Sequence, residues 1–173
     1  GGLWMLDFDG TDDYINCGSN ASLRILNYLT LKLWINLDQY VDYELLIGMT
    51  KTGVAQANYE LYAQTDGTDG ELYFQFDNGA GGWITDQTTT MNMVVGTWYH
   101  IVVTYDDVAD QVTYYKNGAQ IEQRALVGTL PTHADDVLLI GKNGANWPTD
   151  GKMTGWSVLN TIWTPTQVRE NYQ

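Results

Sequence analysis

The sequence predicts an all-β fold in which two antiparallel sheets pack into a sandwich, and three observations support this. Apolar residues alternate with polar or mixed residues along several stretches, as in strands that bury one face. Asp-Gly and Asn-Gly pairs, which favour tight turns, recur between these stretches. Patterns typical of helices are scarce, and 18 of the 173 residues are glycine. Many short strands with frequent turns favour a sandwich over a fold of alternating strands and helices.

The strands are predicted from the alternation and the turns from the glycine pairs. The clearest runs cover residues 29–37, 72–76 and 101–105, where every second residue is a large apolar one. Seven pairs are expected to supply the positive φ of turns, at residues 9–10, 66–67, 69–70, 78–79, 117–118, 143–144 and 150–151. Around Asn117-Gly118, residues 111–116 and 119–124 are predicted to form a hairpin.

One short helix is predicted near the end of the chain, at about residues 165–172. Thr164 suits the N-cap, Pro165 the first helical position and Gln167 the third position of a capping box. No composition shift or repeat divides the chain, and 44% apolar residues suffice for one core. Residues 1–173 are therefore expected to form a single domain.

The charge balance excludes several classes of partner. The net charge is −13, from 21 acidic and 8 basic residues. Nucleic-acid binding depends on Lys and Arg, so it is disfavoured, as are anionic membranes and polyanions. No apolar run approaches the length of a membrane helix, and no membrane insertion is expected. The single cysteine, Cys17, cannot form an internal disulfide and is expected to be a small buried residue.

Blocks of sequence that stand in a characteristic order resemble a known family. They are residues 6–15, 29–35, 96–106, 114–118 and 140–141, followed by a closing block at 151–172. In this order they resemble the laminin G-like domains of the concanavalin A-like lectin/glucanase superfamily. The resemblance implies a two-sheet antiparallel jelly roll with chain ends close together. It also implies that Trp34 and Trp98, which lie in strand motifs of the family, belong to the core.

An enzymatic function is not expected. Glucanases of this superfamily carry paired carboxylates on one strand, and retaining hydrolysis requires the two about 5–5.5 Å apart. No Glu-x-Asp-x-x-Glu pattern occurs, and Glu71 and Asp77 would be about 20 Å apart on a strand. His100 lies in a strand motif and is expected to pack, while His133 lies in a predicted loop. Two distant histidines and one cysteine lack the ligand spacing of a zinc site.

Calcium is the one cofactor that the acidic loops suit, because it takes six to eight oxygen ligands. Two groups of residues qualify. They are Asp77, Asn78, Asp135 and Asp136 near one predicted strand end, and Asp9, Asp12 and Asp13 in the first turn. The Asp77 loop resembles the rim loop that supplies a calcium aspartate in laminin G-like domains, although Thr154-Gly155 stands where the family often has further acids. The alternative is that these residues serve the turns themselves, with solvated carboxylates.

Aromatic residues indicate where a ligand would bind. Seven tryptophans and twelve tyrosines accompany only three phenylalanines, a bias toward rings that stack on sugars and occupy interfaces. Trp83 and Trp147 lie in predicted loops and are the preferred ligand contacts. Tyr59 and Tyr62 lie on opposite faces of one predicted strand, so one of them is expected to be exposed and available.

Two functions remain open. The first, implied by the resemblance, is a non-catalytic carbohydrate-binding or adhesion module of an extracellular, bacterial-surface or phage protein. The alternative is a structural or decoration domain of a virion or surface assembly, which mediates protein–protein contacts. The expected partner is accordingly a glycan or a protein, the expected location is extracellular, on the cell surface or in a virion, and an origin within a larger protein or assembly stays open. Trp83 and Trp147 on one surface near Asp77 would favour the first function.

Overall fold

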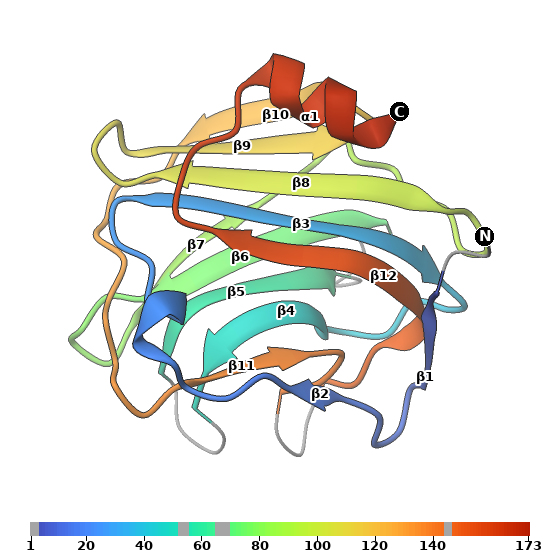
Figure 1. Ribbon diagram of the computed structural model, residues 1–173, viewed down its shortest axis with the longest axis horizontal. Coiled ribbons are helices and arrows are strands. Elements are labelled where there is room, and N and C mark those ends of the chain that lie inside the picture. Colours follow the sequence, from blue (N-terminus) through green and yellow to red (C-terminus); the bar gives the residue numbers. More distant parts are fainter. Residues whose placement is uncertain (1–3, 52–55, 65–69, 144–146) are drawn as a thin grey trace.

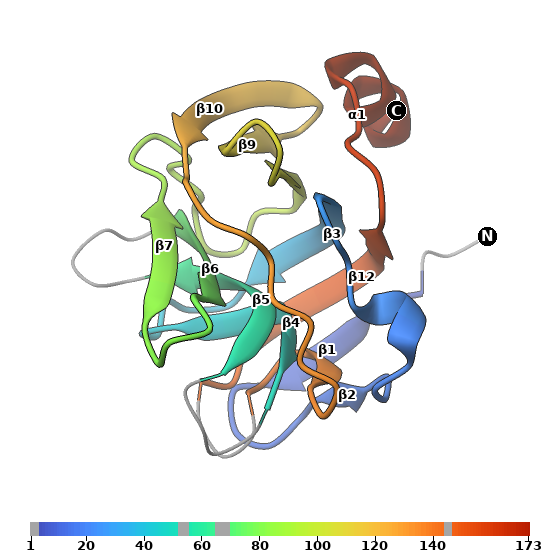
Figure 2. The ribbon, with the colours of Figure 1, turned by 90° about the vertical axis from the view of Figure 1, so that its left-hand side faces the viewer.

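A computed structural model describes residues 4–51, 56–64, 70–143 and 147–173, which form two six-stranded antiparallel sheets (Figures 1 and 2). The first sheet has the order β1 (Leu6–Asp9), β12 (Asp150–Leu159), β3 (Tyr28–Leu37), β8 (Tyr99–Asp106), β9 (Gln111–Lys116) and β10 (Ala119–Ala125). The second has the order β2 (Ile15–Asn16), β11 (Val137–Ile140), β4 (Glu44–Thr50), β5 (Ala57–Gln64), β6 (Glu71–Asp77) and β7 (Trp83–Gln87). A short 3-10 turn, η1 (Ala21–Leu23), and one α-helix, α1 (Pro165–Tyr172), complete the fold. The predicted jelly-roll sandwich is confirmed.

The core lies between the two sheets and follows the alternation in the sequence. Leu31 and Leu33 of β3 are fully buried and face the other sheet, whereas Lys32 and Trp34 lie on the outer face. Phe74 of β6 meets them from the second sheet. Each large apolar side chain buried in this way contributes roughly 1.5–3 kcal/mol relative to an exposed position, so the alternation itself fixes which face of each sheet is internal.

The predicted hairpin is confirmed, and one predicted turn is wrong. Asn117 and Gly118 join β9 to β10 with φ values of 51° and 78°, the conformation that a two-residue hairpin turn requires. Gly151, by contrast, lies inside β12, opposite Leu37 of β3. A Cβ on Gly151 would lie 2.3 Å from the carbonyl oxygen of Asn36. This glycine therefore permits a close approach of two strands and makes no turn. Asp66-Gly67, Asp69 and Gly144 lie outside the described residues.

Helix α1 begins where the sequence predicts. The Thr164 side chain accepts a hydrogen bond from the backbone N–H of Gln167, whose side chain accepts from the N–H of Thr164. Val168 packs against Val102 and Tyr115 on the outer face of the first sheet, and Figure 2 shows α1 outside the sandwich. Among the described residues, no helix is both long and apolar enough to cross a membrane.

Two expectations about burial are wrong. Trp34 and Trp98 are not part of the core: both are half-buried on the outside of the first sheet. Trp34 is out of phase with the leucines of β3, so the pleat directs its ring outward. Cys17 is exposed, because it directly follows the two-residue edge strand β2.

Candidate functional site on the outer face of the second sheet

The outer face of the second sheet is built by the residues that alternate with the core residues of β5 and β6. Tyr62 lies directly opposite Tyr73, and Glu60 directly opposite Gln75. Side chains in such cross-strand pairs share one face of a sheet and contact each other. An aromatic pair therefore lies beside a polar pair on a rigid surface.

Four aromatic rings form one cluster on this face, which we call the tyrosine–tryptophan cluster: Tyr43, Tyr62, Tyr73 and Trp147. The Trp147 ring lies 5.9 Å from Tyr62 and 6.0 Å from Tyr43, and Tyr43 meets both other tyrosines edge-on. Tyr62 is buried beneath the others, Tyr43 and Tyr73 are half-buried, and Trp147 is 41% exposed. The cluster therefore presents an exposed indole on a base of phenol rings.

The backbone holds this cluster in unusual conformations. Tyr43 and Trp147 have φ values of 61° and 57°, a region that bulky residues seldom adopt and that costs on the order of 1–3 kcal/mol. Hydrogen bonds fix both segments: Leu45 N donates to the Trp147 carbonyl at 3.1 Å, and Thr149 Oγ1 donates to the Leu45 carbonyl at 2.7 Å. Strain held in place by surrounding contacts is common where a side chain must be presented to a ligand.

A buried carboxylate anchors the same loop. Glu44 is completely buried and accepts a hydrogen bond from the backbone N–H of Asp150 at 2.9 Å. Its other oxygen has no hydrogen-bond partner among the described residues. Burial raises the pKa of Glu44 to about 8, with a smaller contribution from the negative charge of Asp150. The base of the Trp147 loop therefore contains a carboxyl group that is mostly protonated at neutral pH.

Beside the aromatic rings lies a polar network around Glu60. This carboxylate is buried and accepts from Gln75 Nε2 at 2.6 Å and from Asn143 Nδ2 at 2.9 Å. Burial is the main cause that raises its pKa, and the nearby charge of Asp136 adds to it. The Asn143 amide also lies 3.3 Å from the Tyr62 hydroxyl, which joins this network to the aromatic cluster. Ring faces next to a few fixed polar groups are typical of small-molecule sites.

The predicted acidic loop lies at the far end of β6. Asp77 is buried, lies 2.5 Å from His133 Nε2 and accepts from the backbone N–H of Gly79. Asp136 accepts from the backbone N–H of Asn58 at 3.0 Å, and Asn58 in turn accepts from His133 N at 2.7 Å. Asp77 and Asp136 are therefore linked indirectly through His133 and Asn58, and each is held by protein donors.

The neighbours of these acids are engaged as well. Asp135 forms an ion pair with Lys51, and the Asn78 side chain accepts from the backbone N–H groups of Ala80 and Gly82. In the part of the chain that the structure describes, the only group of three acids whose ligand oxygens lie within 4.8 Å of one another is in the first turn.

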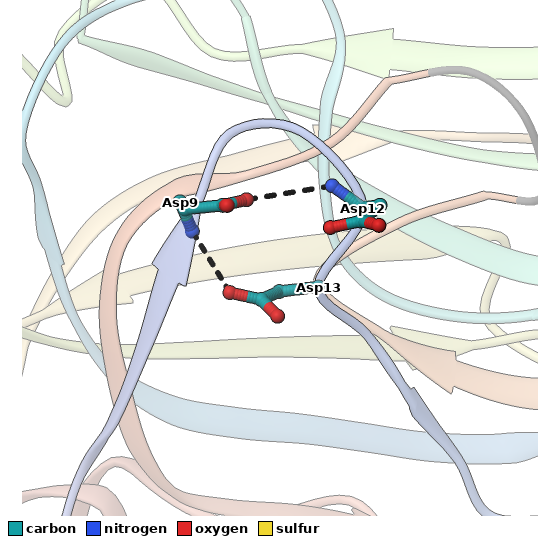
Figure 3. Close-up of side chains that lie close together, drawn as sticks. All are labelled: Asp9, Asp12 and Asp13. Carbon is teal, nitrogen blue, oxygen red and sulfur yellow. Dashed lines mark hydrogen bonds between the residues drawn. The ribbon is translucent and has the colours of Figure 1, made fainter.

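That group comprises Asp9, Asp12 and Asp13, all exposed (Figure 3). Asp9 Oδ1 accepts from the backbone N–H of Asp12 at 3.4 Å, and Asp13 Oδ2 accepts from the N–H of Asp9 at 3.2 Å. Asp9 also lies directly opposite Asp150 in the pairing of β1 with β12. Like charges opposite each other repel, so four carboxylates in this corner produce a strongly negative surface.

The structure places the two predicted ligand-binding tryptophans on one face but not side by side. Trp83 begins β7 opposite Asp77, whereas Trp147 contacts Tyr62, which lies opposite Tyr73 of β6. Tyr73 and Asp77 are four residues apart on β6, or about 13 Å at roughly 3.3 Å per residue. The tryptophans therefore lie over opposite ends of the same strand.

One expectation about the tyrosines is wrong. Tyr59 and Tyr62 do lie on opposite faces of β5, but both are buried. Tyr59 belongs to the core and donates to the Leu23 carbonyl at 2.8 Å, while Tyr62 is covered by Tyr43 and Trp147. Loops that are remote in sequence thus cover the position that alternation alone would leave open.

A family model, described as the concanavalin A-like lectin/glucanases superfamily (Laminin_G_3), matches residues 9–169. The chain belongs to this family. No curated protein sequence matches this laminin G-like chain. The solved structures described next are at most 19% identical to it and show the fold alone.

Three solved structures illustrate the similarity. Domain 4 of AbnA, an extracellular arabinanase of Geobacillus stearothermophilus in complex with arabinotriose, has a TM-score of 0.66 at 19% identity, over 86% of this chain and 68% of that one. The heptameric SAP-like pentraxin of Limulus polyphemus has a TM-score of 0.69 at 15% identity, over 98% and 81%. The binding domain of botulinum neurotoxin serotype G has a TM-score of 0.73 at 10% identity, and the laminin G-like chain spans only 42% of it.

Proposed function

We propose that this laminin G-like domain is a non-catalytic carbohydrate-binding or adhesion module that binds its glycan on the outer face of the second sheet. The observation that carries the proposal is the exposed Trp147 indole, presented on Tyr43 and Tyr62 beside the Glu60 network. Sugar rings stack on such aromatic faces while their hydroxyls bond to fixed amides and carboxylates. Gln75 and Asn143 supply amides in a fixed orientation.

The charge of the domain favours a neutral glycan. The net charge is −13, and the Glu60 carboxyl is held by amides rather than by a cation. A carboxylate or sulfate on the ligand would meet this acidic group without a compensating charge. Arabinotriose, which is bound to the arabinanase domain of similar fold, is therefore a suitable first probe.

Binding without catalysis is supported by the state of the acids on this face. Hydrolysis of a glycosidic bond requires one carboxyl as acid and a second as nucleophile or base. Asp77 is paired with His133, and Asp136 accepts from a backbone N–H and from Gln56. Each of these carboxylates is engaged by the protein, so Glu60 has no free second carboxyl with which it could form a catalytic pair.

The first experiment is a glycan array probed with the wild-type domain and with the Trp147→Ala and Trp83→Ala variants. We expect at least one neutral glycan to bind, Trp147→Ala to weaken the signal by removing binding at this face, and Trp83→Ala to weaken it only for longer chains that reach along β6. The control is Trp4→Ala, because Trp4 is 93% exposed and lies outside this face. An array without any bound glycan would contradict the proposal.

A second proposed function is that of a structural or decoration domain in a virion or surface assembly. It is favoured by Val108 and Val127, which are 69% and 72% exposed. The segments that carry them are joined by the hydrogen bond from Leu126 N to the Asp110 carbonyl at 2.8 Å, so two exposed apolar side chains lie on connected loops beside β9 and β10. Light scattering of the wild type and of Val108→Asp distinguishes the two functions, since only an assembly domain should self-associate and lose that association in the variant.

We also propose that the Asp9–Asp13 turn binds calcium with low affinity. The carboxylates offer hard oxygen ligands, and their mutual repulsion would be relieved by a cation. With a dissociation constant on the order of 1 mM, 10 mM calcium should stabilise the domain by about 1.4 kcal/mol, a rise in melting temperature of roughly 3–5 °C. An equal melting temperature with calcium and with chelator, or an undiminished rise in Asp12→Asn, would refute this.

The location that fits these proposals is extracellular, on a cell surface or in a virion. The proposal is supported by the extracellular arabinanase to which one domain of similar fold belongs. Immunogold labelling or fractionation of the source would test it, and retention in the cytosol would contradict it.

A further inference from the structure

A second aromatic slot lies on the opposite side of the molecule, on the outer face of the first sheet. It has a volume of about 410 Å³ and is lined by Met5, Trp34, Trp98, Thr154, Asn171, Tyr172 and Gln173. None of these side chains is charged. The volume is within the range of roughly 300–1,000 Å³ that is usual for small-molecule sites. We refer to it as the tryptophan slot.

The walls of the tryptophan slot are fixed by regular structure. Trp34 occupies an outward position of β3, and the Tyr172 ring at the end of α1 stacks on it at 5.6 Å with an interplanar angle of 22°. His100 lies 5.1 Å from Trp34 and is buried beneath these rings. The aromatic surface is therefore preorganised, which lowers the entropic cost of binding.

The polar groups of the slot are fixed as well. Asn171 Oδ1 accepts from Lys32 Nζ at 3.0 Å and lies 3.3 Å from His100 Nε2. These contacts orient the amide so that its nitrogen is the group left for a ligand. Thr154 Oγ1 donates to the Trp4 carbonyl at 2.5 Å, which directs its lone pairs away from that contact. The slot thus offers an amide donor and a hydroxyl acceptor beside three aromatic rings.

Docking of α1 accounts for the stacking of Tyr172 on Trp34 but not for the position of Trp98. The helix is held by Val168 against Val102 and Tyr115, with Trp163 beside them. Trp98 belongs to neither that cluster nor the main core, although it is a large apolar side chain next to open space. A structural role would pack the Trp98 ring against other apolar groups, as Val168 is packed, rather than leave it along an open slot.

We infer that the tryptophan slot is a second carbohydrate site, which binds the terminal ring of a neutral oligosaccharide independently of the first site. Aromatic faces with an amide and a hydroxyl, and no charge, match a polyhydroxylated ring that is apolar on its faces and polar at its edge. A purely apolar ligand would leave the Asn171 amide unpaired, which disfavours it. The two sites lie on opposite outer faces of the sandwich, so one short glycan cannot occupy both. The domain would bridge two glycan chains and gain avidity on a glycan-covered surface.

The test uses the indole N–H signals of the seven tryptophans in the ¹⁵N-labelled domain, assigned with single Trp→Phe variants. The probes are arabinotriose and cellotriose, each titrated alone. We expect the signals of Trp34 and Trp98 to shift along a saturating curve, and to do so unchanged in Trp147→Ala. Trp98→Ala should weaken binding at the slot at least tenfold and leave the shift of Trp147 intact. Tyr172→Ala repeats the test at the 39% exposed last residue of α1, outside the sandwich itself. The control is Leu26→Ala, at a 50% exposed position outside both proposed sites.

The outcomes separate this inference from the proposed function. Shifts confined to Trp147 would overturn the second site and leave the first intact, whereas shifts confined to Trp34 and Trp98 would support the slot and contradict the first site. Absence of shifts with both sugars would overturn both. Shifts of Trp34 and Trp98 that follow protein concentration without sugar would show that the slot is a contact between copies, and would overturn the inference.

Discussion

Replacing Glu44 with glutamine should remove a large part of the pH dependence of stability between about pH 5 and pH 8. Burial raises the pKa of this carboxyl from 4.5 to about 8, so the native state binds its proton more tightly than the unfolded state does. The favourable contribution is fully present below pH 4.5 and is lost as the pH rises through 8. One pKa unit corresponds to about 1.4 kcal/mol, which gives an upper limit of about 5 kcal/mol over the whole range.

A glutamine at this position cannot ionise, yet it keeps an oxygen that can accept from Asp150 N, as Glu44 does at 2.9 Å. We therefore expect Glu44→Gln to match the wild type within about 1 kcal/mol at pH 5 and to exceed it by roughly 2–4 kcal/mol at pH 8.5. Urea unfolding followed by tryptophan fluorescence at several pH values measures this difference. Other buried carboxyls contribute equally to the pH dependence of stability in both proteins. The control is Glu170→Gln, at an exposed position, which should leave that pH dependence unchanged. Parallel stability curves for Glu44→Gln and the wild type would refute the reasoning.

Two further predictions concern stability. Gly151→Ala should lower the free energy of unfolding by at least about 3 kcal/mol, because the new Cβ would lie 2.3 Å from the Asn36 carbonyl oxygen. Gly18→Ala should lower it by only about 1 kcal/mol, because Gly18 has a φ of 79° but no atom near the position of the new Cβ. Equal losses in urea unfolding would contradict this account. Thr164→Ala should lower the free energy of unfolding by about 1 kcal/mol, because it removes the side chain that caps Gln167 N. Amide hydrogen exchange should accelerate in α1 alone, and unchanged exchange rates there would contradict a stabilising role of the cap.

The fold could be predicted because its signals are local. The alternation in residues 29–37 fixes the inward face of β3, and the conformational preference of Asn117-Gly118 fixes one hairpin. The capping box at Thr164 likewise places the start of α1. The same alternation assigns Trp34 to the outer face, because it lies between the inward-facing Leu33 and Ile35, and the core position that the family resemblance implies is wrong.

The candidate site could be predicted only in part. Tyr73 is out of phase with the core residues of β6, so its outward position was available from the sequence. Tyr43 and Asn143 reach the site from loops that are far apart in sequence, and no local pattern indicates their proximity to Tyr62. Asp150-Gly151 has the composition of a turn but lies within a strand, because pairing with β3 dictates its conformation.

The most direct test of the proposed function is isothermal titration calorimetry with the best-binding neutral glycan. Trp147→Ala removes the exposed ring of the tyrosine–tryptophan cluster and should weaken binding at least tenfold, or about 1.4 kcal/mol, while Trp4→Ala should bind as the wild type does. Both proteins in the comparison also carry Trp98→Ala, so that only the site on the second sheet can bind. We predict that the double variant Trp98→Ala/Trp147→Ala binds the glycan at least tenfold more weakly than Trp98→Ala alone. Equal affinity of these two proteins would contradict the assignment of the glycan to this face.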